Sequence, residues 1–75
     1  MEEILHEASD VGTFLRARRK SLGITQARVA ALCGTGVRFI SDLENGKPRV
    51  ELCKVLDVAS ALGVDLFARV RGSAV

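Results

Sequence analysis

The chain has no tryptophan, no tyrosine and one histidine, and its two cysteines, Cys33 and Cys53, lie far apart. A zinc site needs four ligands at close spacings, so we expect no metal ion and no cofactor. The chain also has no glycine-rich phosphate loop and no set of catalytic side chains, so we expect no enzyme. The two cysteines are interpreted as buried, reduced thiols.

No apolar run approaches the about 20 residues that a membrane span requires. The start of the chain is acidic, whereas a signal peptide begins with basic residues, so we expect a cytoplasmic protein without a membrane partner. The 75 residues fit one domain, and 48% hydrophobic with 27% charged residues are typical of a globular chain. Folding at this size hides only about 60% of the unfolded chain's surface, which favours a partner subunit.

Apolar residues at helical spacing, interrupted by glycines, predict four short helices. They cover about residues 10–22, 26–33, 37–44 and 51–62. Thr25 is the predicted N-cap of the second helix, and Ser9 or Asp10 that of the first. The residues predicted to face the core are Val11, Leu15, Leu22, Val29, Ala30, Leu32, Cys33, Ile40, Leu43, Leu52, Val55, Leu56, Ala59 and Leu62.

The period changes after Gly63, where the alternating VDLFARVR predicts a strand. One face of this strand would carry Val64, Leu66, Ala68 and Val70. A single strand leaves its backbone groups unpaired, so we favour pairing with the same strand of a second copy. Pairing with the segment around Ile4 and Leu5, or a partly ordered tail, are the alternatives. The chain divides into an N-terminal segment 1–9, a helical domain 10–63 and a C-terminal strand and tail 64–75.

The residues between the second and third helices suit a tight two-helix corner. Ala30 is small where two helices must approach, and Gly34 can adopt the left-handed turn. Together with Thr25-Gln26 and the LENGK run that ends at Lys47, they resemble the helix-turn-helix of the Cro and phage-repressor family, also called the Xre family. The resemblance spans about residues 11–64 and implies an all-α, lambda-repressor-like DNA-binding domain of four to five helices. The C-terminal β-strand would pair across a dimer. The alternative to the DNA-binding interpretation is a helical hairpin without a DNA role.

Arg19 falls at a core-facing position, where an unpaired charge would cost several kcal/mol. Glu44 at the end of the third helix is its predicted partner, and the resemblance implies that this pair ties the first helix to the third. The neighbouring Arg16, Arg18 and Lys20 form either a solvated basic face or a set of phosphate contacts.

In the Xre family the third helix enters the major groove of DNA, so the resemblance implies that residues near its start read bases. In this sequence they are Val37, Arg38, Ser41 and Asp42, with Gly36 beside them. Arg38 is the strongest candidate because a guanidinium donates two hydrogen bonds to guanine. Gly36 and Val37 stand where many relatives have Ser or Thr followed by Gln. Phe39, next to them, either packs on another helix or lies against a sugar.

Phosphate contacts are expected at the amino end of the second helix, from Thr25 and Gln26. The loop after the third helix offers further contacts from Asn45, Lys47 and Arg49. Such contacts position a protein on DNA without specifying the sequence.

The run FISDLENGKPRV, followed by LCKVLDVASALGVDL and the terminal strand, is similar to HipB-type antitoxins. These are small repressors paired with a HipA-type serine/threonine kinase toxin. The resemblance implies a homodimer that represses its own operon at an inverted-repeat operator and inhibits the kinase by binding. A stand-alone repressor or the controller of a restriction-modification system is the alternative, and a protein-interaction adaptor is a more distant one.

Overall fold

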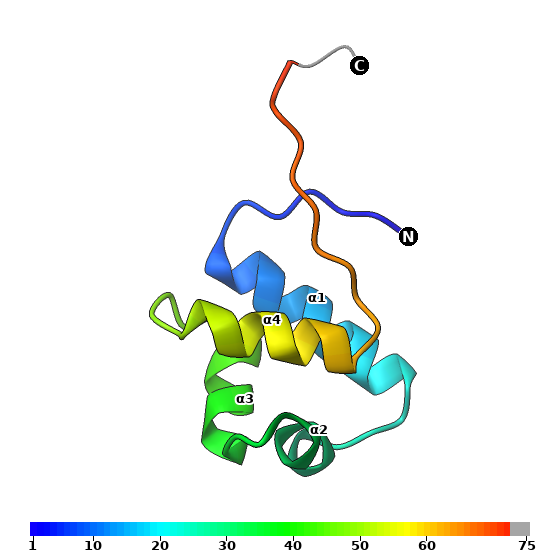
Figure 1. Cartoon of the computed structure of the whole chain (residues 1–75), viewed down its shortest axis with the longest axis vertical. Helices are drawn as coiled ribbons and strands as arrows, with labels where there is room; N and C mark the ends of the chain where they lie inside the picture. The colour runs from blue at the N-terminus through cyan, green and yellow to red at the C-terminus, as the bar shows by residue number, and fades with distance from the viewer. Residues whose placement is uncertain (73–75) are drawn as a thin grey trace.

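Four helices make up the folded part of the chain (Figure 1). They are α1 (Ala8–Ser21), α2 (Gln26–Cys33), α3 (Val37–Glu44) and α4 (Leu52–Ala61). The computed structural model describes residues 1–72, so the end of the predicted tail, 73–75, lies outside the described residues. The four predicted helices are confirmed. None of the helices in the described part of the chain has the length and apolar character to cross a membrane.

The helix ends follow from capping chemistry. The hydroxyl of Thr25 accepts a hydrogen bond from the backbone N–H of Arg28 at 3.1 Å, which makes Thr25 the N-cap of α2 as predicted. Gly34 ends α2 in the left-handed conformation, with φ of 64°. The predicted start of α1 is wrong, because Glu7 is its N-cap. Asp10 lies within the helix and accepts hydrogen bonds from the N–H groups of the two residues before Ala8, at 3.0 and 3.1 Å.

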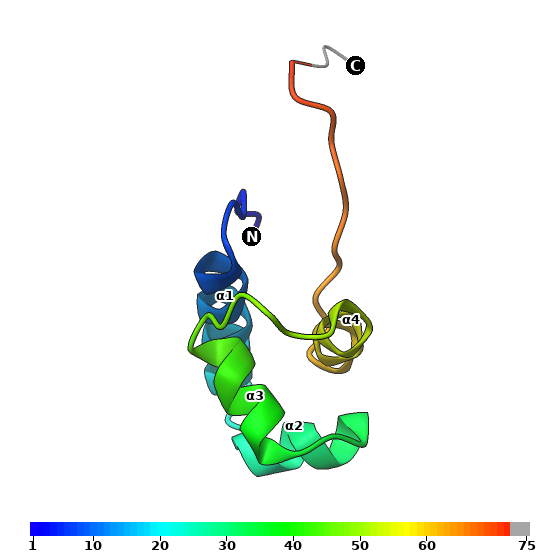
Figure 2. The ribbon, with the colours of Figure 1, turned by 90° about the vertical axis from the view of Figure 1, so that its left-hand side faces the viewer.

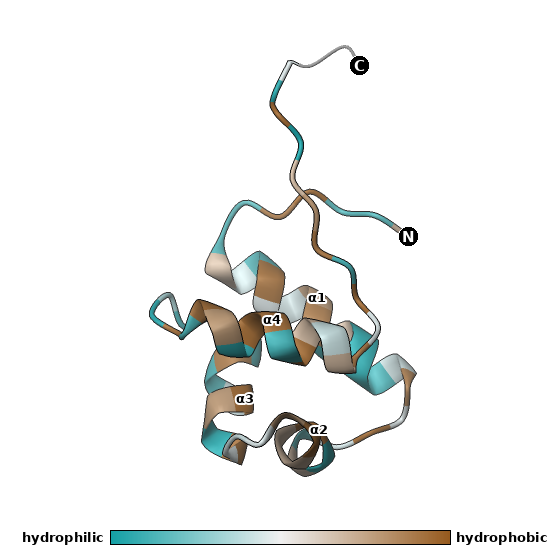
Figure 3. Cartoon of the chain, viewed as in Figure 1, coloured by the Kyte–Doolittle hydropathy of each residue, from teal (hydrophilic) through white to brown (hydrophobic). Residues whose placement is uncertain are grey.

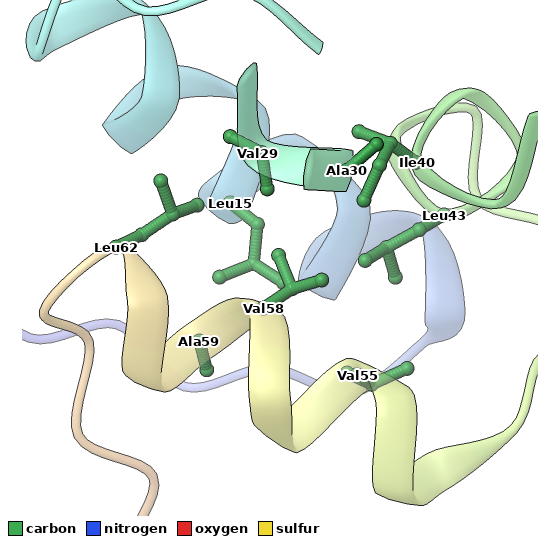
Figure 4. Packing of buried hydrophobic residues seen from close by; sticks show 9 residues of the cluster. All are labelled: Leu15, Val29, Ala30, Ile40, Leu43, Val55, Val58, Ala59 and Leu62. Atoms are coloured by element: carbon green, nitrogen blue, oxygen red, sulfur yellow. The ribbon is translucent and has the colours of Figure 1, made fainter. Parts of the chain in front are cut away.

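The core lies between all four helices (Figure 4). It consists of Leu15, Val29, Ala30, Ile40, Leu43, Val55, Val58, Ala59 and Leu62. Figure 1 shows α4 lying across α1, with α2 and α3 at the opposite end of the molecule from the two chain termini. No buried side-chain nitrogen or oxygen within residues 1–72 lacks a hydrogen-bond partner.

Four leucines predicted to be buried are exposed. Leu22 lies beyond the last residue of α1, and Leu32, Leu52 and Leu56 lie at the edges of the stripes that α2 and α4 bury. The prediction missed Val58, which is 2% exposed and lies at the centre of the buried stripe of α4. Helical spacing identifies a stripe, but the packing partners determine which of its flanks is covered.

The two cysteines also differ from the prediction. Cys53 is exposed and Cys33 is half-buried, so the expectation of two buried thiols is wrong. Burial and the nearby charge of Asp57 raise the pKa of the Cys33 thiol. Cys33 is therefore held in the protonated, poorly nucleophilic form.

The chain after α4 leaves the helical body as an extended segment (Figures 1 and 2). No strand forms between residues 1 and 72 of the single chain. Val64 is half-buried against the core, whereas the other three residues of the predicted strand face, Leu66, Ala68 and Val70, are exposed. An open groove of about 630 Å³ separates this segment from the N-terminal one, and Phe14 of α1 also lines it. Pairing of the segment with a second copy stays a prediction.

Candidate nucleic-acid interface

A buried ionic cluster fixes α3 to the two helices before it. Arg19 of α1 donates from Nε to Oε2 of Glu44 at 2.6 Å and from Nη2 to Oε1 at 3.0 Å. The side-chain amide of Gln26, at the start of α2, donates to the same Oε1 at 3.0 Å. Arg19 also donates from Nη1 to the carbonyl of Ile24 at 2.8 Å. Glu44 thus joins α1, α2 and α3 at one point.

The charges in this cluster stabilise each other. Burial alone raises the pKa of the Glu44 carboxyl, but the hydrogen bonds from Arg19 and Gln26 and the charges of Arg19 and Arg16 outweigh burial and lower it overall. The hydrogen bond to Glu44 raises the pKa of Arg19 in turn, against the opposing effect of burial. Both groups are therefore charged at neutral pH, with the carboxylate accepting and the guanidinium donating.

A backbone contact between α1 and α3 was not predicted from the sequence. A Cβ added to Gly12 of α1 would overlap the carbonyl oxygen of Leu43, so only glycine allows the two helices to lie this close. Gly46, after α3, has φ of +77° and lies against Ser9 in the same way. A glycine inside a helical pattern was the available signal for Gly12.

α3 turns one face to the core and the other to solvent. Ile40, Leu43 and Glu44 are buried, whereas Val37 is 46% exposed and Arg38 is exposed as well. Figure 2 looks onto α3, with α4 seen end-on beside it and α2 below. Gly36 is the N-cap of α3 and provides no side-chain cap. The first two residues of α3, Val37 and Arg38, are therefore open to solvent, whereas Phe39 and Ile40 in the same turn pack inward.

The four predicted base-reading residues lie together on α3, but two of them already have partners. Val37 and Arg38 are exposed. Ser41 is half-buried, and its hydroxyl accepts a hydrogen bond of 3.4 Å from the amide of Asn45. Asp42 is half-buried as well, and its carboxylate lies 3.7 Å from the ammonium of Lys47. Asn45 and Lys47 connect the outer face of α3 to the following loop.

The five predicted phosphate contacts fall in two groups, one at the start of α2 and one in the loop after α3. Thr25 and Gln26 lie at the start of α2, where the Thr25 hydroxyl caps the helix and the Gln26 amide holds Glu44. Asn45, Lys47 and Arg49 are exposed in the loop between α3 and α4. Figure 3 shows this loop as largely hydrophilic.

The basic residues at the end of α1 have separate environments. Arg18 donates from Nε to the carbonyl of Leu62 at 2.8 Å and thereby caps the end of α4. Arg16 lies at the edge of the ionic cluster, 4.0 Å from Glu44. Lys20 is exposed. The sequence does not predict the Arg18 contact, because its partner lies far along the chain.

A family model and a known relative both identify a helix-turn-helix protein. The model of the family HTH_3, described as helix-turn-helix, matches residues 15–68. The HTH-type transcriptional regulator y4mF of Sinorhizobium fredii is 39% identical over 70 residues, which cover 91% of this chain and 92% of that protein.

Solved structures have the same arrangement of helices. A HipB variant in an O2 20mer complex has a TM-score of 0.87 at 18% identity, covering 95% of this chain and 99% of HipB. HipB in a HipA-HipB-O2-O3 complex has a TM-score of 0.86 at 17% identity, covering 93% and 99%. The restriction-modification controller protein C.AhdI of Aeromonas hydrophila has a TM-score of 0.69 at 29% identity, covering 77% of this chain and 84% of that one. At their low identities the HipB structures show a shared fold alone.

Proposed function

The chain belongs to the helix-turn-helix family HTH_3, and from this premise we propose that it is a transcriptional repressor that binds double-stranded operator DNA with α3 in the major groove. The observation that carries the proposal is the exposure of Val37 and Arg38 at the start of α3, on a helix whose inner side is fixed by a fully paired ionic cluster. A major groove about 12 Å wide admits one helix with its side chains. The buried side of α3 is fixed, so its outer side is presented at a constant angle.

Each residue on this face has a distinct proposed role. Arg38 donates two hydrogen bonds to the edge of a guanine, which is worth about 1–3 kcal/mol of discrimination. Val37 contacts a thymine methyl group. Ser41 and Asp42 read a base only if they exchange their present partners, Asn45 and Lys47, for it. Arg38 and Val37 therefore dominate the sequence preference.

Phosphate contacts on two sides position α3 in the groove. The free N–H groups at the start of α2, with Thr25 and the second N–H of the Gln26 amide, face one strand. Asn45, Lys47 and Arg49 face the other strand from the loop after α3. These contacts supply affinity and orientation but no sequence preference.

We propose further that the protein binds as a homodimer. The N–H of Val64 is bonded to the carbonyl of Ala59 at 2.8 Å, but the backbone groups of residues 65–70 have no partner within the described part of the chain. The same segment exposes Leu66, Phe67 and Val70. Pairing with the same segment of a second copy would satisfy the backbone and cover these side chains. Two copies whose α3 helices lie about 34 Å apart would read the two halves of an inverted repeat.

The finer function that we propose is that of an antitoxin to a HipA-type serine/threonine kinase. It is supported by the solved HipA-HipB-O2-O3 complex, whose HipB has this fold, and by the similarity of residues 39–66 to HipB-type antitoxins. The second candidate is a stand-alone repressor or a restriction-modification controller, supported by the likeness to C.AhdI. A protein-interaction adaptor is the remaining alternative.

Two experiments test these proposals. The affinity for a duplex that carries the chain's own promoter is measured against salt concentration, and release of several phosphate counterions must give a steep log–log slope. A slope near zero would contradict the DNA proposal and favour an adaptor.

Co-expression with a kinase encoded beside the gene, if one is present, tests the antitoxin role. A stable complex that suppresses kinase activity supports it, and an adjacent methyltransferase gene in place of a kinase contradicts it.

A further inference from the structure

A lysine outside the predicted site is held against α3. The ammonium of Lys54, in the first turn of α4, lies 5.6 Å from the centre of the Phe39 ring. Phe39 follows Arg38 on α3, and its half-buried ring packs against the core. A cation above an aromatic ring is attracted by the electrons of the ring. The ring therefore keeps a flexible side chain beside the helix that we propose for the groove.

Folding alone gives little reason for a positive charge at this place. The amino end of a helix carries the positive end of its dipole, so a lysine in the first turn of α4 is electrostatically unfavourable. Glu51 lies 3.9 Å from the Lys54 ammonium, but its side chain is 65% exposed and that of Lys54 is 45% exposed. An exposed ion pair of this kind contributes little to stability. The charge fits better with a ligand that is negatively charged.

The position of Lys54 beside α3 points to a phosphate of DNA as that ligand. Figure 1 shows the start of α4 at the same edge of the molecule as α3, whereas the end of α4 lies at the opposite edge. Figure 2 shows α4 beside α3 when α3 faces the viewer. A helix in the major groove has a sugar-phosphate strand along each side. With α3 in the groove, the start of α4 would lie toward one of these strands.

We propose that Lys54 binds a phosphate of the strand on the α4 side of the groove, and that Phe39 is the residue that positions its ammonium. This inference rests on the proposed function and adds a contact to those of the loop between α3 and α4. The partner is the phosphate and not a base, so the contact strengthens binding equally at all sequences. It also gives Phe39 a role besides packing.

The test uses a mixed-sequence duplex of about 30 base pairs, several helical turns long, and fluorescence anisotropy over a range of salt concentrations. Loss of one phosphate contact makes the plot of log affinity against log salt concentration less steep by about 0.9 for each bound copy. When the salt concentration falls from 1 M to 0.1 M, the affinity of such a variant should therefore rise about eightfold less than that of the unaltered protein. Lys54→Gln is expected to show this loss. Lys54→Arg, which keeps the charge and stacks on the ring, is expected to bind as the unaltered protein does. Arg71→Gln removes the same charge from the exposed end of the C-terminal segment and serves as the control.

The outcomes separate this inference from the proposed function. A steep slope for the unaltered protein and for Arg71→Gln, with a reduced slope for Lys54→Gln, supports the inference. A steep slope that Lys54→Gln leaves unchanged overturns the role of Lys54 and leaves DNA binding intact. Equal reductions in Lys54→Gln and Arg71→Gln overturn it too, because net charge would then explain both. A flat slope for the unaltered protein contradicts the proposed function itself.

Discussion

Removal of one member of the buried pair between Arg19 and Glu44 is expected to cost a large part of the stability of the fold. In Glu44→Met the guanidinium of Arg19, whose side chain is 10% exposed, stays buried without its carboxylate. Breaking a buried ion pair in this way costs about 3–5 kcal/mol. A chain of 75 residues has a total free energy of unfolding of about 4–11 kcal/mol, from about 0.05–0.15 kcal/mol per residue. Glu44→Met should therefore be marginally folded at 25 °C.

The double variant distinguishes pairing from simple loss of a side chain. Replacing both charges with methionine removes the uncompensated charge, so Arg19→Met/Glu44→Met should be more stable than either single variant. Urea denaturation followed by circular dichroism measures all three, with Glu51→Gln as an exposed control expected within about 0.5 kcal/mol of the unaltered protein. Additive losses in the double variant would refute the reasoning.

The same pair predicts a dependence on acid. The folded pKa of Glu44 lies below its unfolded value of about 4.3, so the folded state gains stability above that value. This stability is lost as the pH falls through the folded pKa, where Glu44 takes up a proton. The unaltered protein should therefore lose more stability between neutral pH and about pH 3 than the double variant does. Equal losses would show that other carboxylates dominate.

Three further predictions concern packing, base reading and assembly. Gly12→Ala should destabilise the protein by about 1–3 kcal/mol, although alanine is favoured over glycine in an ordinary helix; thermal unfolding against Thr13→Ala measures this, and a stabilised variant would contradict the close contact. Arg38→Ala should relax the preference at one base pair, whereas Lys47→Ala should weaken binding to all duplexes alike; equal losses on operator and random DNA for both would end that division. Deleting the chain from residue 66 onward should shift sedimentation toward the monomer, and an unchanged dimer would place the interface elsewhere.

The helices were predictable because short-range chemistry determines their ends. Glycines after α1, α2 and α4 and the threonine N-cap of α2 act within a few residues, so the sequence shows them directly. Contacts between distant segments were not predictable in the same way. The Arg18 bond to the Leu62 carbonyl joins residues that are 44 apart, and the backbone contact at Gly12 depends on where α3 lies.

The sequence predicted which residues lie at the candidate site better than it predicted the contacts between them. The helical period places Val37, Arg38 and Ser41 on one side of α3, whichever helices cover the other side. It does not show that Asp42 already faces Lys47, or that the Gln26 amide is engaged by Glu44. These pairings depend on side-chain reach across turns, which spacing alone does not determine.

The cluster around Glu44 lies on the inner side of α3, while Val37 and Arg38 on its outer side have no share in it. Changes at these two outer positions should therefore cost the protein little stability. After a gene duplication, each copy could acquire a new target by exchanging these side chains while its scaffold stayed the same. Because the inner side of α3 carries the stability and the outer side carries the contacts to the target, such regulators can diverge in target with little loss of stability.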